Sequence, residues 1–469
     1  MENESESNVN FVPCIRWVKR GVASTNPTNV QLSKDELVQI INETKQKLSI
    51  SGNPTQSNGD VAMEAEVGST EDEFNFNDYD KDDGHHAAQA LGIHSLAELP
   101  AEADDHFSES DDSEKEDDLI KATDNLILVG HVEGDASILE VYVYNEEDES
   151  FYVHHDILLP TFPLCLEWLN YEPKQPQGNY CAIGAMSPII EVWDVDVMNC
   201  IEPAFKLGKP ASTKKKREAV GHKDAVLSLA WNKTYEHVIA SGSVDQTILL
   251  WDMETQTPNV TIKAFEEKVQ CLEWHKFEGQ TLLAGGCDST VRVFDCRNPE
   301  KHQTWRLSGE AERLIWNPLQ PFMFLAGTSD GCVECFDCRK GKLWSLTAHE
   351  KEVTGLTISG QCPGLLVTAS PDETVKTWDF TDENLPILVN EKEFKMGNIH
   401  CLELCPDSPF VIALGGDKKS SNFTVYDLQN VDPIKHTFGS RELIQLVPDS
   451  TDESKAISRA DENLNASST

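Results

Sequence analysis

Apolar and polar residues alternate most regularly in residues 221–252, GHKDAVLSLAWNKTYEHVIASGSVDQTILLWD. Three short apolar runs lie within this stretch, at residues 225–231, 237–241 and 247–251. Each run has the length of a strand, and each either alternates or is apolar enough to be buried in a sheet. The stretch therefore predicts three consecutive strands joined by short turns.

The same unit recurs along the chain, as the aromatic residue in its last strand shows. Seven positions share this place: Tyr144, Trp193, Trp251, Phe294, Phe336, Trp378 and Tyr426. Their successive separations are 49, 58, 43, 42, 42 and 48 residues, and a period of about 40–45 residues is typical of WD repeats, the blades of a β-propeller. The pattern predicts an all-β fold, a seven-bladed WD-repeat propeller over residues 119–440.

A second periodic position marks the end of the innermost strand of a blade. It is filled by Trp168, Trp231, Trp274, Trp316, Ile358 and Leu404. The blade that ends at Tyr144 has no such strand directly before it, although residues 126–132, 138–145 and 150–159 supply its other strands. Far upstream, PCIRWV has the same shape as CLEW and SLAW in the other blades. We therefore expect residues 11–18, within the segment 11–20, to be the innermost strand of blade one.

A long insertion of different composition separates that strand from the rest of blade one. Residues 21–59 predict a linker with one helix, 33–48, which either docks a partner or packs on the propeller. Residues 60–118 contain 21 Asp and Glu against Lys81 and Lys115, which leaves too little apolar surface for a core. We expect this acidic segment to be largely disordered, like the tails at residues 1–10 and 441–469.

The formal net charge of the 469-residue chain is −41. Binding to a nucleic-acid backbone requires clustered Lys and Arg, so direct nucleic-acid binding is not expected as the main activity. Basic protein partners fit the charge better, namely histones, ribosomal proteins, and ribosome-assembly or chromatin factors. The 13 cysteines are an odd number. No apolar run follows Met1 or is long enough to span a membrane, so we expect a reducing compartment without membrane contact.

Four residues of the central repeat match the structural tetrad of a WD repeat: His222, Ser241, Asp245 and Trp251. A buried Asp must be paired, and the indole N–H of a buried Trp needs an acceptor. We interpret the set as a hydrogen-bond relay that holds the blade together, although His, Ser and Asp are also the residue types of a catalytic triad. Gly-rich phosphate-binding loops and HExxH metalloprotease motifs are absent from the sequence. We therefore expect no enzyme and no cofactor.

Cys332, Cys335 and Cys338 form a C-x2-C-x2-C pattern, which invites a zinc interpretation. Alternation along a strand would place Cys332 and Cys335 on opposite faces, so we interpret all three as structural thiols without a metal. The pairs His85-His86 and His154-His155 lack a third ligand and are not interpreted as sites.

A dense basic cluster, Lys214, Lys215, Lys216 and Arg217, lies in the loop that leaves blade two. We interpret it as a nuclear localisation signal rather than a solubilising loop or a contact to nucleic acid. Within the acidic segment, Ser108, Ser110 and Ser113, and also Ser69 and Thr70, stand among carboxylates that acidophilic kinases prefer. These five residues are candidate phosphorylation sites.

The combination of IRWVKRGVA, EVWDVDV, the KKKR loop, DAVLSLAWN and ILLWDM resembles the periodic tryptophan protein 1 family. The resemblance covers the N-terminal strand, the predicted helix and the propeller. It implies a WD-repeat protein of the nucleus and nucleolus, with a role in ribosomal RNA transcription and processing, ribosome biogenesis and chromatin. The function expected from it is a non-catalytic scaffold.

An alternative of a different class rests on FDCR, which occurs at residues 294–297 and 336–339. It resembles the ending with which some WD proteins dock to adaptors of cullin ubiquitin ligases, and Arg297 or Arg339 would then bind the adaptor. The competing interpretation is a repeat corner held by Asp–Arg pairing, which we prefer. A propeller enzyme is the least favoured class.

Overall fold

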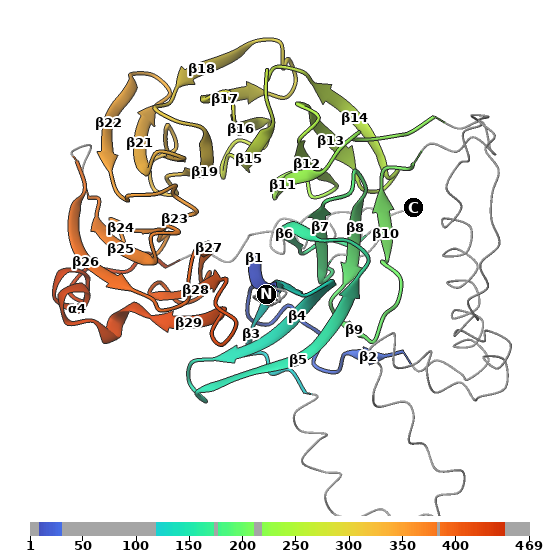
Figure 1. The fold of residues 1–469 in the computed structure, drawn as a ribbon, viewed down its shortest axis with the longest axis horizontal. Helices are drawn as coiled ribbons and strands as arrows, with labels where there is room; N and C mark the ends of the chain where they lie inside the picture. Colours follow the sequence, from blue (N-terminus) through green and yellow to red (C-terminus); the bar gives the residue numbers. More distant parts are fainter. Residues whose placement is uncertain (1–8, 31–118, 173–176, 211–217, 382–384, 446–469) are drawn as a thin grey trace, which may run out of the picture. The chain divides into compact units, whose positions relative to one another are not determined.

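The structure, a computed structural model, describes residues 9–30, 119–172, 177–210, 218–381 and 385–445. In these residues seven antiparallel sheets stand around a central axis like the blades of a propeller (Figure 1). Six of the sheets have four strands and the seventh has three. The seven-bladed propeller predicted from the sequence is confirmed.

The strands of each blade are given from the innermost outwards. Blades one and two consist of β1 (Asn10–Val18), β3 (Asn125–Glu133), β4 (Ala136–Asn145) and β5 (Ser150–Leu159), and of β6 (Pro163–Leu169), β7 (Tyr180–Ala185), β8 (Ile190–Asp194) and β10 (Phe205–Leu207). Blades three and four consist of β11 (Val226–Trp231), β12 (Val238–Ser243), β13 (Ile248–Asp252) and β14 (Thr257–Ile262), and of β15 (Val269–Trp274), β16 (Thr281–Gly286), β17 (Thr290–Asp295) and β18 (His302–Arg306). Blades five and six consist of β19 (Ala311–Trp316), β20 (Met323–Thr328), β21 (Cys332–Asp337) and β22 (Gly341–Thr347), and of β23 (Gly355–Ile358), β24 (Leu365–Ala369), β25 (Thr374–Asp379) and β26 (Ile387–Glu393). Blade seven consists of β27 (Ile399–Leu404), β28 (Val411–Gly416) and β29 (Phe423–Asp427).

The repeat-ending aromatic residues all lie in the third strand of their blades. Trp193, Trp251, Phe294 and Phe336 are among the largest fully buried side chains. Large aromatic side chains bury the most apolar surface per residue, so these positions anchor the contacts between neighbouring blades. The periodicity that identifies the repeats is thus the periodicity of the core.

The N-terminal strand β1 is the innermost strand of blade one. It pairs antiparallel with β3, with Ile15 opposite Val129 and Trp17 opposite Ile127. Its neighbours around the axis are β6 of blade two and β27 of blade seven. Residues more than a hundred positions before the rest of the blade therefore close the ring between its first and last blades.

A glycine on the second strand faces a bulge in the innermost strand in six of the seven blades. The bulge ends at Cys14, Cys165, Ser228, Cys271, Arg313 or Cys401, and the residues opposite are Gly130, Gly184, Gly242, Gly285, Gly327 and Gly415. A Cβ atom at Gly184 would lie 2.5 Å from the Sγ atom of Cys165. Where the bulge ends at a cysteine, the glycine makes room for the thiol that the bulge turns toward it.

The same glycines allow the next blade to approach closely. A Cβ atom on Gly184 would lie 2.9 Å from Val226, and one on Gly415 would lie 2.6 Å from Val12 of β1. The thiol of Cys165 contacts the carbonyl of Val226 at 3.8 Å, and that of Cys401 contacts the carbonyl of Val12 at 3.5 Å. The contact that joins blade seven to blade one therefore repeats the contact between internal blades.

Both ends of the described propeller extend beyond the repeat pattern. In the predicted linker, β2 (Thr28–Asn29) pairs parallel with β9 (Val197–Met198). After β29 the chain forms a short 3-10 helix, η2 (Leu428–Asn430), and a helix, α4 (Asp432–Phe438), which the repeat analysis did not predict. Residues 441–445 were expected in the disordered tail, but Arg441 binds Asp379 at 2.6 Å and the Ile444 N–H donates to the Gln361 carbonyl. That boundary was wrong, because ordered contacts with blade six continue past residue 440.

The predicted helix at 33–48, the acidic segment at 60–118 and most of both predicted tails lie outside the described residues. Among the residues that are described, no helix is long and apolar enough to cross a membrane.

Candidate functional site

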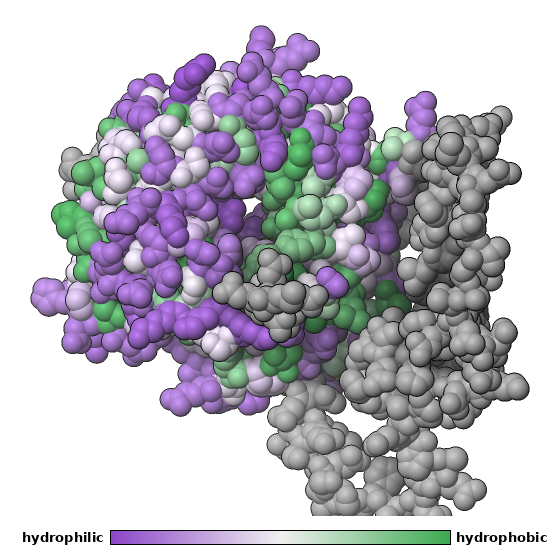
Figure 2. All heavy atoms as spheres, in the orientation of Figure 1, coloured by the Kyte–Doolittle hydropathy of each residue, from purple (hydrophilic) through white to green (hydrophobic). Residues whose placement is uncertain are grey.

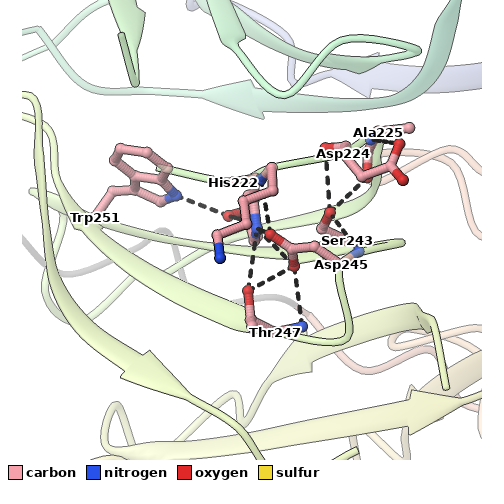
Figure 3. A network of polar contacts seen from close by, with 9 residues as sticks. His222, Asp224, Ala225, Ser243, Asp245, Thr247 and Trp251 are labelled. Atoms are coloured by element: carbon pink, nitrogen blue, oxygen red, sulfur yellow. Dashed lines mark hydrogen bonds and ion pairs between the residues drawn. The ribbon is translucent and has the colours of Figure 1, made fainter. Parts of the chain in front are cut away.

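The predicted tetrad lies between the start of blade three and its third strand (Figure 3). The Trp251 indole N–H donates to the Ser241 hydroxyl oxygen at 2.7 Å, and the Ser241 hydroxyl donates to His222 Nε2 at 2.6 Å. His222 Nδ1–H donates to an Asp245 carboxylate oxygen at 3.1 Å. Burial alone would raise the pKa of Asp245, but hydrogen bonds from His222 and Thr247 hold it well below its usual range.

The chemistry of this relay is structural. The Ser241 side chain is fully buried and its oxygen already accepts a hydrogen bond from Trp251. A substrate cannot reach it, and a nucleophile needs a free approach to the reacting atom. The relay instead ties the loop before blade three to the second and third strands of that blade.

A second network of the same kind lies in blade six, and the sequence analysis missed it. His349 binds Thr368 at 2.8 Å and Asp372 at 3.0 Å, and the Trp378 indole donates to Thr368 at 3.0 Å. The sequence separations from the His, 19 to the hydroxyl and 23 to the Asp, equal those in blade three. That spacing could have identified the second network from the sequence. It was missed because Thr368 stands where blade three has Ser241.

Replacing Thr368 by Ala should destabilise the propeller by about 2–4 kcal/mol, because two buried polar groups, on His349 and Trp378, lose their partner. Thr368→Ser keeps the hydroxyl and should recover most of that loss. Thermal or urea unfolding of the two variants beside the wild type measures the difference. Equal destabilisation by Ala and Ser would show that the methyl group, and not the relay, matters here.

A different cluster of polar side chains lies in the central channel of the propeller. The channel is a cavity of about 300 Å³ lined by all seven innermost strands. Four strands place a charged residue at the same register position, just before the periodic Trp or Leu. These residues are Arg16, Glu167, Glu273 and Glu403. Their side chains form a charged layer around the channel.

Arg16 joins the two blades that flank β1. Its Nε and Nη2 atoms bind Glu167 of blade two at 2.9 and 2.6 Å, and its Nη1 atom binds Glu403 of blade seven. Burial alone would lower the pKa of Arg16, but the two carboxylates outweigh it and raise that pKa. One guanidinium thus links the first strand of the chain to blades on both sides of it.

Two glutamates of this layer, and Arg313 of blade five, bind backbone groups on the open edges around the channel. Glu167 accepts the Trp231 backbone N–H at 3.2 Å, and Glu273 accepts that of Trp316 at 2.6 Å. Arg313 donates to the carbonyl of Thr354 at 2.7 Å. An innermost strand has no neighbour on its channel side, so these bonds satisfy edge groups that would otherwise be left open.

We expect Glu273 to make the stability of the propeller depend on pH. Burial raises the pKa of its carboxyl to about 8, against the opposing effect of the Trp316 N–H. Because the folded state holds the proton more tightly than the unfolded state, wild-type stability should fall as pH rises from about 4.5 to 8. Glu273→Gln cannot ionise, so its stability relative to the wild type should increase over that window. We expect about 1–2 kcal/mol at pH 8.5, less than full burial would give, because the carboxyl faces a channel.

Unfolding temperatures at pH 5 and pH 8.5 test this expectation, with the exposed residue Glu350 changed to Gln as the control. A difference between Glu273→Gln and the wild type that is the same at both pH values would contradict it.

The predicted adaptor-binding residues are both engaged within their own repeat corners. Arg297 binds Asp295 at 2.6 Å, and Arg339 binds Asp337 at 2.8 Å. The Arg339 guanidinium also lies over the Phe322 ring, 4.1 Å from its centroid. These bonds are the Asp–Arg pairing of the structural interpretation, although both arginine side chains remain more than half exposed.

The cysteine and histidine motifs do not form a metal centre in the described part of the chain, where no group of three or more His, Cys, Asp or Glu is arranged to hold an ion. Cys335 is fully buried in β21, whereas Cys332 and Cys338 are only partly buried. His154 and His155 contact each other at 2.8 Å, and burial lowers the pKa of His155 to about 4. All 13 cysteines are free thiols.

Two sets of predicted site residues fall outside the described residues. They are the basic cluster Lys214 to Arg217 and the phosphorylation candidates Ser69, Thr70, Ser108, Ser110 and Ser113. The structure does describe both ends of the loop that carries the basic cluster. Lys209 and Val220 exchange two backbone hydrogen bonds, of 2.8 and 2.9 Å, which fix the base of that loop.

Comparison with known proteins agrees with the repeat architecture. Residues 213–252, 256–295 and 340–379 match the family described as WD domain, G-beta repeat. A chain in the crystal structure of the mitotic checkpoint complex has the same fold, with a TM-score of 0.50 and 19% identity over 65% of this chain and 84% of that one. A ribosome biogenesis protein WDR12 homolog of Oryza sativa subsp. japonica is 27% identical over 24% of this chain and 22% of its own.

Two relatives cover most of the chain. Periodic tryptophan protein 1 of Saccharomyces cerevisiae is 28% identical over 85% of this chain and 84% of its own. The periodic tryptophan protein 1 homolog of Drosophila melanogaster is 41% identical over 93% of this chain and 98% of its own. This identity, over nearly the whole length of both proteins, shows that the chain belongs to the periodic tryptophan protein 1 family of WD-repeat proteins.

Proposed function

We propose that this chain is a non-catalytic scaffold of the nucleus and nucleolus that supports ribosomal RNA transcription and processing, ribosome biogenesis and chromatin association. The observation that carries the proposal is that the residues of catalytic-triad type form structural hydrogen bonds instead. In the described blades, such buried bonds engage His222, Ser241 and Asp245 and their counterparts in blade six. The partial similarity to proteins named for ribosome biogenesis supports the pathway.

The partners that fit the chain are basic proteins. Its net charge is −41, and residues 60–118 contribute 21 carboxylates against two lysines. Such a segment attracts basic surfaces over distances of about 8 Å at physiological salt. Phosphorylation at Ser69, Thr70, Ser108, Ser110 or Ser113 would add about −1.5 to −2 each and strengthen that attraction. Histones, ribosomal proteins, and ribosome-assembly and chromatin factors have the required charge.

Proximity labelling in nuclei, with the labelling enzyme fused to the full chain, tests the pathway. Enrichment of ribosome-assembly and chromatin factors over a fusion to an unrelated propeller is the expected result. A labelled set without either class would overturn the proposal. The corner geometry at Arg297 and Arg339 does not favour the ubiquitin-ligase alternative, because each guanidinium already binds its own Asp.

Changing Lys214, Lys215, Lys216 and Arg217 together to Ala should shift the protein from the nucleus to the cytoplasm, because a localisation signal depends on clustered positive charge. The nuclear-to-cytoplasmic ratio of a fluorescent fusion is the measurement, and a decrease of at least about threefold is expected. The control changes the exposed lysines Lys418 and Lys419 to Ala, which removes positive charge elsewhere on the propeller. An unchanged ratio for the cluster variant would rule out this loop as the signal.

A further inference from the structure

The outer edge of blade seven differs from that of the other blades. In blades one to six the third strand lies between the second and a fourth strand, whereas the described part of blade seven ends at β29. All five residues of β29 are only partly buried, while four of the five residues in the third strand of blade three are fully buried. The sheet of blade seven therefore ends in an open edge.

The backbone groups on that edge can be assigned from the pairing with β28. The Gly416 N–H donates to the Asn422 carbonyl at 2.7 Å, and the Leu428 N–H donates to the Phe410 carbonyl at 2.9 Å. Bonding direction alternates along an antiparallel strand, so Thr424 and Tyr426 also face β28. Phe423, Val425 and Asp427 then turn their N–H and C=O groups outward, where no described strand pairs with them.

Exposed apolar side chains flank this edge on both sides. In blade one, Phe151 and Val153 of β5 are 45% and 46% exposed, and the Phe151 ring lies 5.9 Å from that of Phe423. In blade six, Ile387 and Leu388 of β26 are 69% and 44% exposed. Figure 2 shows hydrophobic residues gathered on the rim over β26. The helix α4 packs near β26 but forms no ladder with β29.

The fourth strands of other blades show which side-chain contacts an added strand would make. Trp305 of β18 in blade four packs on Phe324 and Phe336 of blade five, with ring centroids 5.4 and 6.2 Å apart. Trp344 of β22 in blade five packs on Phe380 of blade six at 5.5 Å. In blades four and five the fourth strand thus supplies an aromatic side chain that covers the next blade. Beside blade seven, the exposed ring of Phe151 in blade one lies where such cover is missing.

The negative charge near the C-terminal end of β29 gives an incoming strand a direction. Asp427 pairs with Val411, and the Ser408 hydroxyl in the adjoining turn donates to Glu146 at 2.6 Å. Glu146 begins an acidic turn, Glu146 to Glu149, although Arg20 and Lys121 contact two of its carboxylates. A strand antiparallel to β29 would begin at this end. Lys or Arg at its N-terminal end would therefore meet carboxylates.

We propose that the outer edge of β29 binds an extended segment of a protein partner as the fourth, antiparallel strand of blade seven, with basic residues at its N-terminal end followed by alternating apolar side chains. Strand addition of this kind takes its affinity from main-chain hydrogen bonds and its specificity from alternate side chains. The proposal concerns the mode of binding and holds whichever pathway supplies the partner, so it goes beyond the proposed function.

A synthetic peptide with the sequence of residues 339–347, RKGKLWSLT, is a suitable probe, because it contains the fourth strand of blade five and begins with basic residues. The test uses the full chain and follows amide hydrogen exchange residue by residue as peptide is added. Exchange at Phe423, Val425 and Asp427 should slow by at least about tenfold. Exchange at Thr424 and Tyr426, which already bond to β28, should not change.

Two variants of Val425 separate the backbone bond from the side chain. Val425→Pro removes one outward N–H and leaves the ladder to β28 intact, whereas Val425→Ala loses the packing of the side chain but keeps that N–H. Peptide affinity should be at least about tenfold weaker for Pro than for Ala. If the Pro variant does not fold, the same comparison is made on the peptide. N-methylation of alternate residues should abolish binding in one register and spare it in the other.

Four results would overturn the proposal. Slow exchange at the three edge residues without peptide would show that another segment of this chain already covers the edge. Slow exchange that depends on protein concentration would show that a second copy does so. The third result is that saturating peptide leaves the exchange of the three edge amides unchanged. The fourth is that the peptide binds the Val425→Pro and Val425→Ala variants equally well, or that the two methylated peptides bind the wild type equally well.

Discussion

Deletion of residues 1–20 should leave a chain that aggregates or unfolds at least about 10 °C below the full-length protein. Five buried side chains of β1 are lost with it: Val12, Cys14, Ile15, Trp17 and Val18. At about 1.5–3 kcal/mol for each large apolar side chain, their burial contributes on the order of 10 kcal/mol. That is comparable to the whole stability of a typical domain. The deletion also exposes the long apolar edge of β3, which is a template for intermolecular pairing.

The control for this experiment deletes residues 2–8 only. It retains β1 and also Val9, whose carbonyl accepts the Gly134 N–H. Thermal unfolding and light scattering of the two truncations beside the full chain give the comparison. If the larger deletion unfolded at the temperature of the full-length protein, β1 would not be part of the closed ring.

Gly415→Val should destabilise the propeller by about 3 kcal/mol or more, the second largest effect that we expect. A Cβ atom there would lie 2.6 Å from both the Val12 side chain and the Cys401 Sγ atom, and 2.8 Å from the Val12 carbonyl. Two of these neighbours are in β1, and one of them is backbone, so relief requires blade one to move away from blade seven. Overpacking a closed interior typically costs about 1–3 kcal/mol, and a backbone clash costs more.

A matched variant separates this clash from the loss of glycine flexibility. Gly341 has a φ of +90°, and a Cβ atom added there would have no neighbour within 4 Å, so Gly341→Ala introduces backbone strain without a clash. Its expected cost is about 1 kcal/mol. Urea unfolding ranks the two variants. A Gly415→Val protein no less stable than Gly341→Ala would show that blades seven and one are not in close contact.

The sequence predicted the fold well because its strongest signals are local. Each repeat except the first carries its own aromatic anchor and its own end of an innermost strand, 20 to 25 residues apart. The displaced strand at residues 11–18 was recognisable for the same reason, since PCIRWV looks like the strands whose place it takes. Residues 222, 241, 245 and 251 lie within one repeat, so their bonding was also predictable.

The features that were missed depend on long-range contacts or on substitutions within a motif. Arg16 binds Glu167 and Glu403, which are 151 and 387 residues away, and nothing in a single sequence marks them as neighbours. The open edge of β29 was missed because a repeat count reports third strands and not whether a fourth one follows. Thr368 hid the second tetrad, although a search by spacing would have found it.

Native-state hydrogen exchange of the full chain shows most directly whether β1 closes the ring between blades seven and two. The amides of β1 that bond to β3 should exchange only through global unfolding, with a free energy within about 1 kcal/mol of that for the buried strand β28. Exchange of the β1 amides that is orders of magnitude faster, while β28 stays protected, would show that the ring holds without its first strand and would contradict closure of the ring by β1.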